Sequence, residues 1–218
     1  RCQLRSPRER RRTCMTYDGI VSRYLNRPLS RPTARALQNT PATPNAVTLF
    51  TLALSAVTAA LVAVGWNIVG GVLIQAVSVI DGVDGELARL KAMSSRFGAV
   101  LDAVTDRYAD ALMLGGMTVY AVRFEDLPRA EVVGMFALAG SLVVSYSRAR
   151  IEASMRRDPS DGLFGLASRD VRSLVAAIGT VIGQCYWTLV IIAVAAGLTV
   201  AWRLVYLRFL AGPAPEGR

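Results

Sequence analysis

Hydrophobic residues along the chain form six runs, separated by short polar segments that contain most of the charges. A helix needs about 20 predominantly apolar residues to cross a bilayer. The runs predict six transmembrane helices, over residues 46–66, 68–89, 97–122, 130–150, 171–184 and 187–206. The fifth run is the shortest and is hardly separated from the sixth. The predicted fold class is therefore an all-α membrane protein.

The segments outside these runs predict the domain boundaries. Residues 28–38 mix Arg with small and apolar residues, which predicts an N-terminal juxtamembrane helix lying on the cytoplasmic surface. Pro44 and Asn45 then break the chain before the first span. We expect a basic N-terminal tail or linker over 1–27, one membrane domain over 28–210 and a C-terminal tail over 211–218.

The distribution of positive charge predicts the orientation. Residues 1–45 carry ten Arg, and the connections after the second and fourth runs are also basic. The first-to-second and fifth-to-sixth turns have no Arg or Lys. Because cytoplasmic loops carry the excess of Lys and Arg, both termini should lie in the cytoplasm. We therefore expect an integral cell membrane protein whose second and third spans meet at the cytoplasmic face.

Composition supports a membrane location and argues against nucleic acid as a partner. Apolar residues make up 53% of the 218 residues, and the mean hydropathy is +0.38. The net charge of +9 comes from basic residues that cluster between apolar runs. That layout is typical of cytoplasmic loops, so the expected partner is the lipid bilayer. The three cysteines have no metal-binding or redox spacing.

Acidic residues at the junction of the second and third runs are the main candidates for chemistry. Asp81 and Asp84 share one face of a helix, and Gly98, Asp102 and Asp106 form a stripe on the next helix. Carboxylates in such runs are costly and are therefore functional candidates. The chain has no His, so an all-oxygen ligand set is expected, which suits Mg²⁺, Mn²⁺ or Ca²⁺. Two alternatives stay open: ion pairs with Arg on neighbouring helices, and a transporter that relays cations through intramembrane acids.

The same stretch carries a family resemblance. From Asp81 to Asp106 it reads D-x2-D-G-x2-A-R-x8-G-x3-D-x3-D, which resembles the signature of the CDP-alcohol phosphotransferase family at every specified position. The resemblance extends from about Pro28 to about Arg208. The segments DGVDGELARLK and SYSRARIEA most resemble the inositol-phosphate branch, which includes di-myo-inositol-phosphate-phosphate synthases and phosphatidylinositol-phosphate synthases. The former are the more similar.

The resemblance implies a role for each residue of the signature. Two divalent cations, Mg²⁺ or Mn²⁺, would be held by Asp81, Asp84, Asp102 and Asp106, and Asp106 would also be the catalytic base. The implied CDP-binding residues are Asp81, Asp84, Gly85, Ala88, Arg89, Gly98 and Asp102. The implied acceptor-phosphate residues are Arg148, Arg150, Arg169 and Arg172. Taken alone, the small residues could equally serve helix packing, and each Arg could serve topology or lipid headgroups.

The favoured activity is transfer of a substituted phosphate from CDP-inositol to inositol phosphate, which gives di-myo-inositol phosphate phosphate and CMP. The nearest alternative is a phosphatidylinositol-phosphate synthase that uses CDP-diacylglycerol. The resemblance also implies a homodimer, and an upstream or separate cytidylyltransferase that supplies the CDP-inositol. A severed upstream domain would explain why an Arg-rich segment, rather than Met, begins the chain.

Three further residues have predicted structural roles. Asp110 continues the 102/106 stripe and should tie helices together rather than bind metal. Glu86 points away from Asp81 on the helix and should be peripheral. Gly179 begins a G-x3-G pattern that permits close helix packing within or between subunits.

Overall fold

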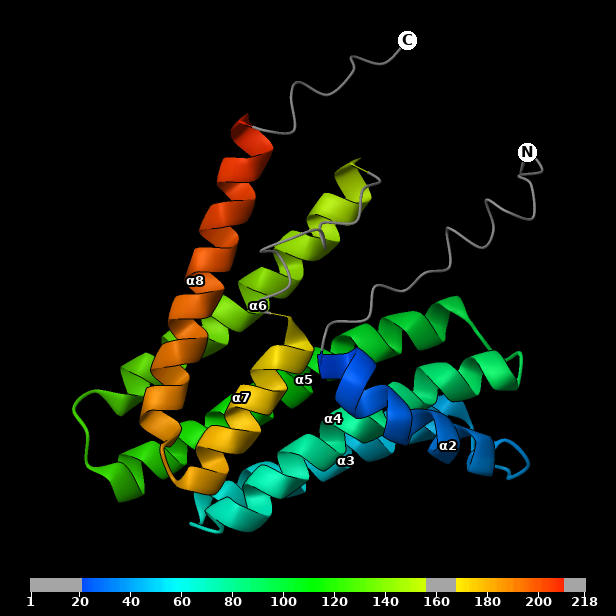
Figure 1. Ribbon diagram of the computed structural model, residues 1–218, viewed down its shortest axis with the longest axis horizontal. Coiled ribbons are helices and arrows are strands. Elements are labelled where there is room, and N and C mark those ends of the chain that lie inside the picture. Colours follow the sequence, from blue (N-terminus) through cyan, green and yellow to red (C-terminus); the bar gives the residue numbers. More distant parts are fainter. Residues whose placement is uncertain (1–20, 156–167, 210–218) are drawn as a thin grey trace.

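The computed structural model describes residues 21–155 and 168–209, which form helices and no strands. The elements are the π-helix η1 (Ser22–Asn26), α2 (Arg27–Leu37), α3 (Pro44–Ala63), α4 (Asn67–Leu90), α5 (Arg96–Tyr120), the π-helix η2 (Ala121–Glu125), α6 (Ala130–Met155), α7 (Arg169–Ile182) and α8 (Cys185–Phe209) (Figure 1). The all-α prediction is confirmed. The predicted tails lie largely outside the described residues, at 1–20 and 210–218.

Four of the described helices are long and apolar enough to cross a membrane: α3, α4, α6 and α8. The predicted third and fifth spans are not among them. Helix α5 has 25 residues but carries four charged side chains in its middle, at Asp102, Asp106, Arg107 and Asp110. Helix α7 has only 14 residues, so it is shorter than a bilayer crossing. Both helices are amphipathic because each turns polar side chains toward the other helices.

The helices pack as two connected groups (Figure 1). Helix α3 packs against α4 and α5, while α6 packs along α8. Helix α7 lies against α4 and joins the groups, and α2 lies across α4. The largest buried cluster includes Val62, Ile74, Leu114, Met117, Leu189 and Ile192, from α3, α4, α5 and α8. The helix predicted at 28–38 corresponds to α2, Arg27–Leu37.

Glycines allow close approaches between helices of the bundle. A Cβ on Gly116 of α5 would lie 2.6 Å from the carbonyl oxygen of Ala59 on α3. A Cβ on Gly71 of α4 would lie 2.7 Å from the carbonyl oxygen of Ala177 on α7. Such distances leave no room for a methyl group, so these glycines fix the spacing of α4 and α5 from their neighbours.

The G-x3-G pattern of α7 acts within the chain. A Cβ on Gly179 would overlap the side chain of Thr188 on α8, so the first glycine allows close packing of consecutive helices. Gly183 ends α7 with a φ of 75°, a left-handed conformation that glycine adopts without a steric penalty. The second glycine therefore makes the tight turn into α8.

One end of the bundle gathers two helix N-termini beside the C-terminus of α4. The side chain of Thr43 caps α3 by accepting from the Ala46 N–H at 3.2 Å. The side chain of Ser95 caps α5 by accepting from the Gly98 N–H at 2.9 Å. These caps satisfy backbone donors that have no partner inside the helix. They fix where α3 and α5 begin, and the signature residues lie beside these starting points.

Candidate active site

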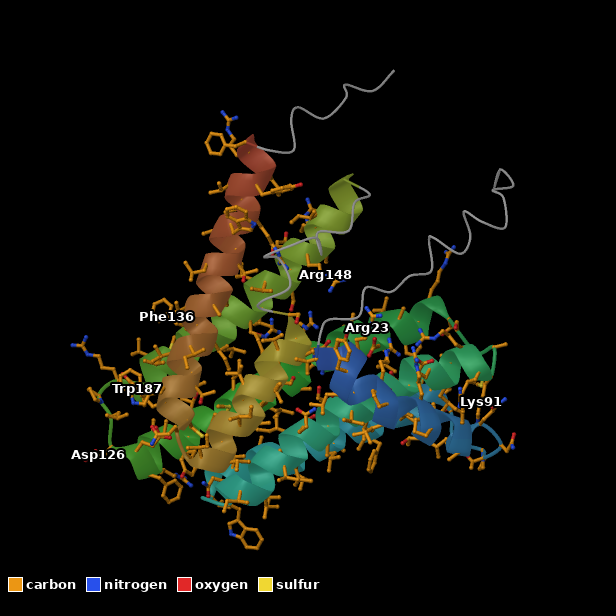
Figure 2. The ribbon with its side chains drawn as sticks, viewed as in Figure 1. Arg23, Lys91, Asp126, Phe136, Arg148 and Trp187 are labelled. Atoms are coloured by element: carbon orange, nitrogen blue, oxygen red, sulfur yellow. The ribbon has the colours of Figure 1, made fainter. Side chains whose placement is uncertain are left out.

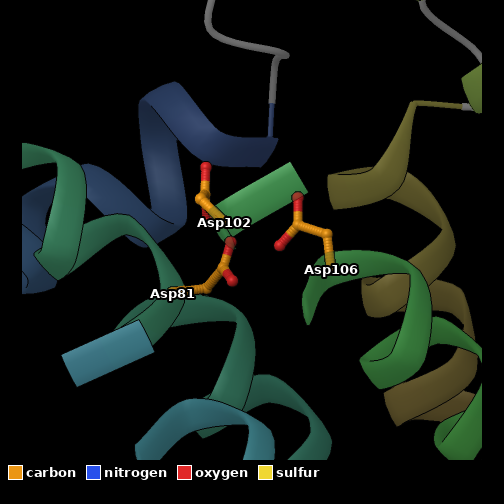
Figure 3. A group of neighbouring side chains, drawn as sticks. All are labelled: Asp81, Asp102 and Asp106. Atoms are coloured by element: carbon orange, nitrogen blue, oxygen red, sulfur yellow. The ribbon is translucent and has the colours of Figure 1, made fainter. Parts of the chain in front are cut away.

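Three carboxylates meet between α4 and α5 (Figure 3). Asp81 extends from α4, and Asp102 and Asp106 extend from consecutive turns of α5. One oxygen from each carboxylate lies within 4.8 Å of the others, and all three residues are half-buried. Three converging carboxylate oxygens suit a hard divalent cation such as Mg²⁺ or Mn²⁺. The donor set therefore fits the metal predicted from the sequence.

Asp84 lies apart from this group, in a site of its own. Its Oδ2 accepts a hydrogen bond from Thr48 Oγ1 of α3 at 2.6 Å, and its Oδ1 accepts from the Gly85 N–H at 2.5 Å. Only 7% of the residue is exposed. The structure thus brings together three of the four predicted metal ligands and directs the fourth toward α3.

A cavity of about 210 Å³ opens beside Asp84. Its walls come from the start of α3, the end of α4, the following connection and the start of α5. It is lined by six of the seven residues predicted to bind CDP, namely Asp84, Gly85, Ala88, Arg89, Gly98 and Asp102. The seventh, Asp81, belongs to the carboxylate cluster. Because Asp102 belongs to both, the cavity and the cluster form one continuous site.

The two signature glycines have different surroundings in this cavity. A Cβ on Gly85 would meet no atom within 4 Å, so the space above it is open. A Cβ on Gly98 would lie 3.2 Å from Asn45 Oδ1, so Gly98 allows α3 to approach α5. A packing role is therefore supported for Gly98, whereas Gly85 leaves volume inside the cavity.

Arg169, at the start of α7, lies directly against the carboxylate cluster. Its Nη1 is 2.5 Å from Asp81 Oδ2 and 2.7 Å from Asp106 Oδ1. Its Nε is 3.5 Å from Asp110 Oδ1. One guanidinium group thus offsets the repulsion among several carboxylates, and an Arg can do so while also presenting donors to an anion.

Asp110, one turn after Asp106 on α5, connects α5 to α6 and α7. It accepts from Arg172 Nη2 of α7 at 2.9 Å and from Ser141 Oγ of α6 at 3.1 Å. The prediction that Asp110 ties helices together is confirmed. Arg172, predicted to bind the acceptor phosphate, is buried and engaged by this carboxylate.

The two predicted acceptor arginines on α6 lie elsewhere. Arg148 and Arg150 are exposed near the C-terminal end of that helix. Figure 2 labels Arg148 on the side of α6 that faces α7 and η1. Of the four predicted acceptor residues, the structure therefore places only Arg169 in contact with the carboxylate cluster.

Glu86 has more contacts than its predicted peripheral position suggested. Its carboxylate pairs with Arg27 Nη1 of α2 at 2.5 Å and with Arg89 Nη2 at 3.2 Å. Arg31 Nε lies 3.7 Å away. Glu86 lies outside the cavity lining, but it joins α2 to α4 and holds Arg89, which lines the cavity.

Comparison with known proteins agrees with this geometry. Residues 41–207 match the model of the CDP-alcohol phosphatidyltransferase family. The chain belongs to this family. The match runs from just before α3 to residue 207 in α8 and includes the whole carboxylate cluster and the cavity.

Two kinds of curated relative are similar to this family member. A bifunctional IPC transferase and DIPP synthase of Rubrobacter xylanophilus is 47% identical over 166 residues, which cover 76% of this chain and 37% of that protein. A phosphatidylinositol phosphate synthase of Mycobacteroides abscessus is 34% identical over 198 residues, covering 87% and 88%. The chain spans between 32% and 42% of the length of the first three bifunctional relatives.

Solved structures of one family member have the same fold. The phosphatidylinositol phosphate synthase of Mycobacterium tuberculosis with CDP-DAG bound superposes with a TM-score of 0.73 at 27% identity, covering 88% of this chain and 98% of that one. A second structure of that enzyme is in complex with manganese and citrate, also with a TM-score of 0.73 and 27% identity, covering 87% and 92%. The divalent-metal dependence of the family agrees with the carboxylate cluster.

Helix α3 contributes to this transferase site in a way that was not predicted from the sequence. Asn45 and Thr48 line the cavity, and Thr48 donates to Asp84. A usable signal was present, because Thr48, Thr51, Ser55 and Thr58 recur at helical spacing within an otherwise apolar run. All four are buried, as a polar stripe in a membrane span should be.

Proposed function

We propose that this chain transfers the inositol-bearing phosphate of CDP-inositol to a hydroxyl of inositol phosphate, releasing CMP and forming di-myo-inositol phosphate phosphate. The observation that carries the proposal is the cluster of Asp81, Asp102 and Asp106, continuous with a cavity lined by the remaining signature residues. In the proposed complex the cytidine end of the donor would occupy the cavity, and its diphosphate would lie beside the carboxylates.

The proposed metal site consists of Asp81, Asp102 and Asp106, with Asp84 completing it from the cavity side. Two divalent cations bound there, Mg²⁺ or Mn²⁺, would neutralise the diphosphate and stabilise the charge that develops during transfer. Thr48 holds the Asp84 carboxylate through its hydroxyl. A short hydrogen bond to a carboxylate restricts its rotation and so fixes the direction of the free lone pairs.

The proposed reaction requires little covalent chemistry from the protein. Gly85 leaves space for the nucleotide, and Arg89, held by Glu86, pairs with its phosphates. Asp106 takes the proton of the acceptor hydroxyl as that oxygen attacks the phosphorus that bears the inositol. A bond from oxygen to phosphorus forms, the bond to CMP breaks, and the electron pair leaves with CMP. In a chain without His, a carboxylate is the available base.

The acceptor phosphate is proposed to bind the arginines of α6 and α7, namely Arg148, Arg150, Arg169 and Arg172. Arg169 supports this best because it already contacts Asp81 and Asp106. A phosphate bound to Arg169 would bring the acceptor within reach of Asp106. Guanidinium groups suit this task because their donors match two phosphate oxygens at once.

The proposed membrane topology has six spans, with α5 and α7 completing those formed by α3, α4, α6 and α8. The short α7 and the charged α5 would be sheltered by other helices, since intramembrane charges face a bundle interior. Helix α2 would lie on the cytoplasmic surface with exposed Arg31 and Arg35 toward lipid headgroups. In this placement the site and both termini would lie on the cytoplasmic side. The chain would divide into a basic tail or linker at 1–27, a membrane domain at 28–210 and a C-terminal tail at 211–218.

Further assembly is part of the same proposal. We propose a homodimer, and a cytidylyltransferase that makes the CDP-inositol, either upstream in a longer chain or as a separate protein. The difference in length from the bifunctional relatives supports the proposed cytidylyltransferase, because the match covers only 32% to 42% of those proteins.

A second candidate donor is CDP-diacylglycerol. The similarity to phosphatidylinositol phosphate synthases over nearly their full length supports it, as does the structural neighbour with CDP-DAG bound. The 47% identity to a bifunctional DIPP synthase supports CDP-inositol more strongly.

The deciding experiment supplies purified protein with radiolabelled inositol phosphate, Mg²⁺ and one donor at a time. The proposal predicts CMP release and a water-soluble labelled product with CDP-inositol. A labelled product that partitions into organic solvent, formed only with CDP-diacylglycerol, would establish the second candidate instead. No CMP release with either donor would reject both.

A further inference from the structure

Lys91 is the only lysine among the 25 basic residues of the chain. It directly follows α4, on which Asp81 and Asp84 lie, and it is half-buried. Its ammonium group donates to two backbone carbonyls of the connection between α2 and α3, Thr40 O at 2.6 Å and Ala42 O at 2.7 Å. Both bonds are short, as expected when the donor is charged. Lys91 therefore fastens this connection to the end of α4.

The fastened connection leads directly into the cavity wall. Thr43, the next residue, caps α3 through its side chain. Asn45 and Thr48 then line the cavity, and Thr48 reaches Asp84. Figure 2 shows Lys91 at this end of the bundle, opposite the end that carries Asp126 and Trp187. Lys91 thus fixes the position of the first turn of α3 relative to α4.

We propose that Lys91 is a positioning residue that sets the shape of the nucleotide cavity by holding the α2–α3 connection. The proposal rests on the proposed function, because it takes the cavity to be the site of the cytidine end of the donor. Lys91 does not line the cavity and acts through Asn45 and Thr48.

The choice of lysine supports a geometric role over a topological one. A positive charge that only keeps a loop in the cytoplasm could equally be Arg, as at every other basic position. An ammonium group is compact and its three donors point apart, so two carbonyls can converge on it. A planar guanidinium on a longer side chain would have to displace the connection to bond both oxygens.

Loss of the ammonium group should affect nucleotide binding more than the chemical step. Two carbonyls would lose their shared donor, and the connection would gain freedom that nucleotide binding must then remove. The carboxylates of Asp81, Asp102 and Asp106 lie on α4 and α5, and Asp84 of α4 meets the affected helix through Thr48. We therefore expect a higher KM for the CDP-alcohol and a smaller change in kcat.

The test compares Lys91→Met, Lys91→Arg and the control Arg35→Met. Arg35 is exposed on α2, so its replacement removes one positive charge from the same region without touching the connection. Binding of CMP in the presence of Mg²⁺ is measured by calorimetry, and KM and kcat by CMP release. We expect about tenfold weaker CMP binding for Lys91→Met, because ordering the released connection consumes part of the binding free energy. Lys91→Arg should lie between Lys91→Met and the wild type, and Arg35→Met should match the wild type.

The results separate this inference from the proposed function. A wild-type protein that does not bind CMP would overturn the proposed function. Wild-type affinity in Lys91→Met, or a loss of kcat without a change in affinity, would overturn the role of Lys91. Full affinity in Lys91→Arg would show that charge alone suffices and would also overturn it. If Lys91→Met does not yield folded protein, the comparison of Lys91→Arg with the wild type decides by the same criterion.

Discussion

Arg172 of α7 and Asp110 of α5 form a buried ion pair, with Arg172 Nη2 2.9 Å from Asp110 Oδ2 and only 4% and 3% of the two residues exposed. Charges are costly inside a helix bundle unless each has a partner. Ser141 and Arg169 contact the same carboxylate. The pair and its neighbours therefore join α5, α6 and α7 one helical turn away from the carboxylate cluster.

Replacing Asp110 should destabilise the protein more than replacing Arg172. Asp110→Leu removes the carboxylate that Arg172, Ser141 and Arg169 all contact, and loss of one member of a buried ion pair should cost about 3–5 kcal/mol. Arg172→Leu leaves Asp110 with Ser141 and Arg169 and should cost less. Thermal unfolding in detergent measures both variants. Equal stability of Asp110→Leu and the wild type would contradict the structural role of the pair.

Asp106→Asn should abolish turnover without abolishing nucleotide binding. The amide cannot accept the proton of the attacking hydroxyl, and loss of a general base typically slows a reaction by about 10²–10⁴-fold. Arg169 keeps its contact with Asp81, so the protein should stay folded. CMP release and CMP binding are measured side by side. A variant with full activity would remove Asp106 from the role of base.

Gly85 and Gly116 should respond in opposite ways to added methyl groups. Gly85→Val should fold normally, because its Cβ would meet no atom within 4 Å, yet it should weaken CMP binding by filling the cavity. Gly116→Ala places a Cβ 2.6 Å from Ala59 O, and such overpacking should cost about 1–3 kcal/mol of stability. Thermal unfolding and CMP titration distinguish the two effects. Unaltered CMP affinity in Gly85→Val would place the nucleotide elsewhere.

Stability should become metal-dependent when Arg169 is removed. Arg169 pairs with both Asp81 and Asp106, and Arg107 also pairs with Asp106, so Arg169→Gln leaves three crowded carboxylates with less positive charge nearby. The variant should melt lower than the wild type in EDTA and gain more in melting temperature when Mg²⁺ is added, because a cation that binds only the folded state stabilises it. Equal gains in both proteins would argue that Arg169 does not compete with a metal at this cluster, and no gain in either protein would argue against metal binding there.

Arg150→Ala should raise the KM for inositol phosphate with a smaller effect on the KM for the donor. A guanidinium group that contacts phosphate contributes roughly 1.5–3 kcal/mol, about a tenfold or greater change in affinity. Steady-state kinetics with each substrate varied in turn measures the difference. Arg129→Ala, a loss of charge outside the proposed site, is the control. An unchanged KM for inositol phosphate would return Arg150 to a role in topology.

Sequence patterns alone were sufficient to predict the helical architecture, the family and the acids of the signature. These depend on local patterns: apolar runs of membrane-spanning length, and a signature of fixed spacing within 26 residues. The helix that includes Asp81 and Asp84, and the next one with Asp102 and Asp106, begin and end close to the predicted positions. A periodic pattern is sufficient there because it reflects which face of a helix is buried.

Which of these side chains contact one another depends on the packing of the helices. Asp84 turns to Thr48 rather than to the other three acids, and Arg169 reaches Asp81 from 88 residues away. Lys91 donates to two carbonyls of the α2–α3 connection, about 50 residues earlier in the chain. Such contacts depend on how helices cross and how closely small residues let them approach, and helical periodicity within one segment carries no information about either.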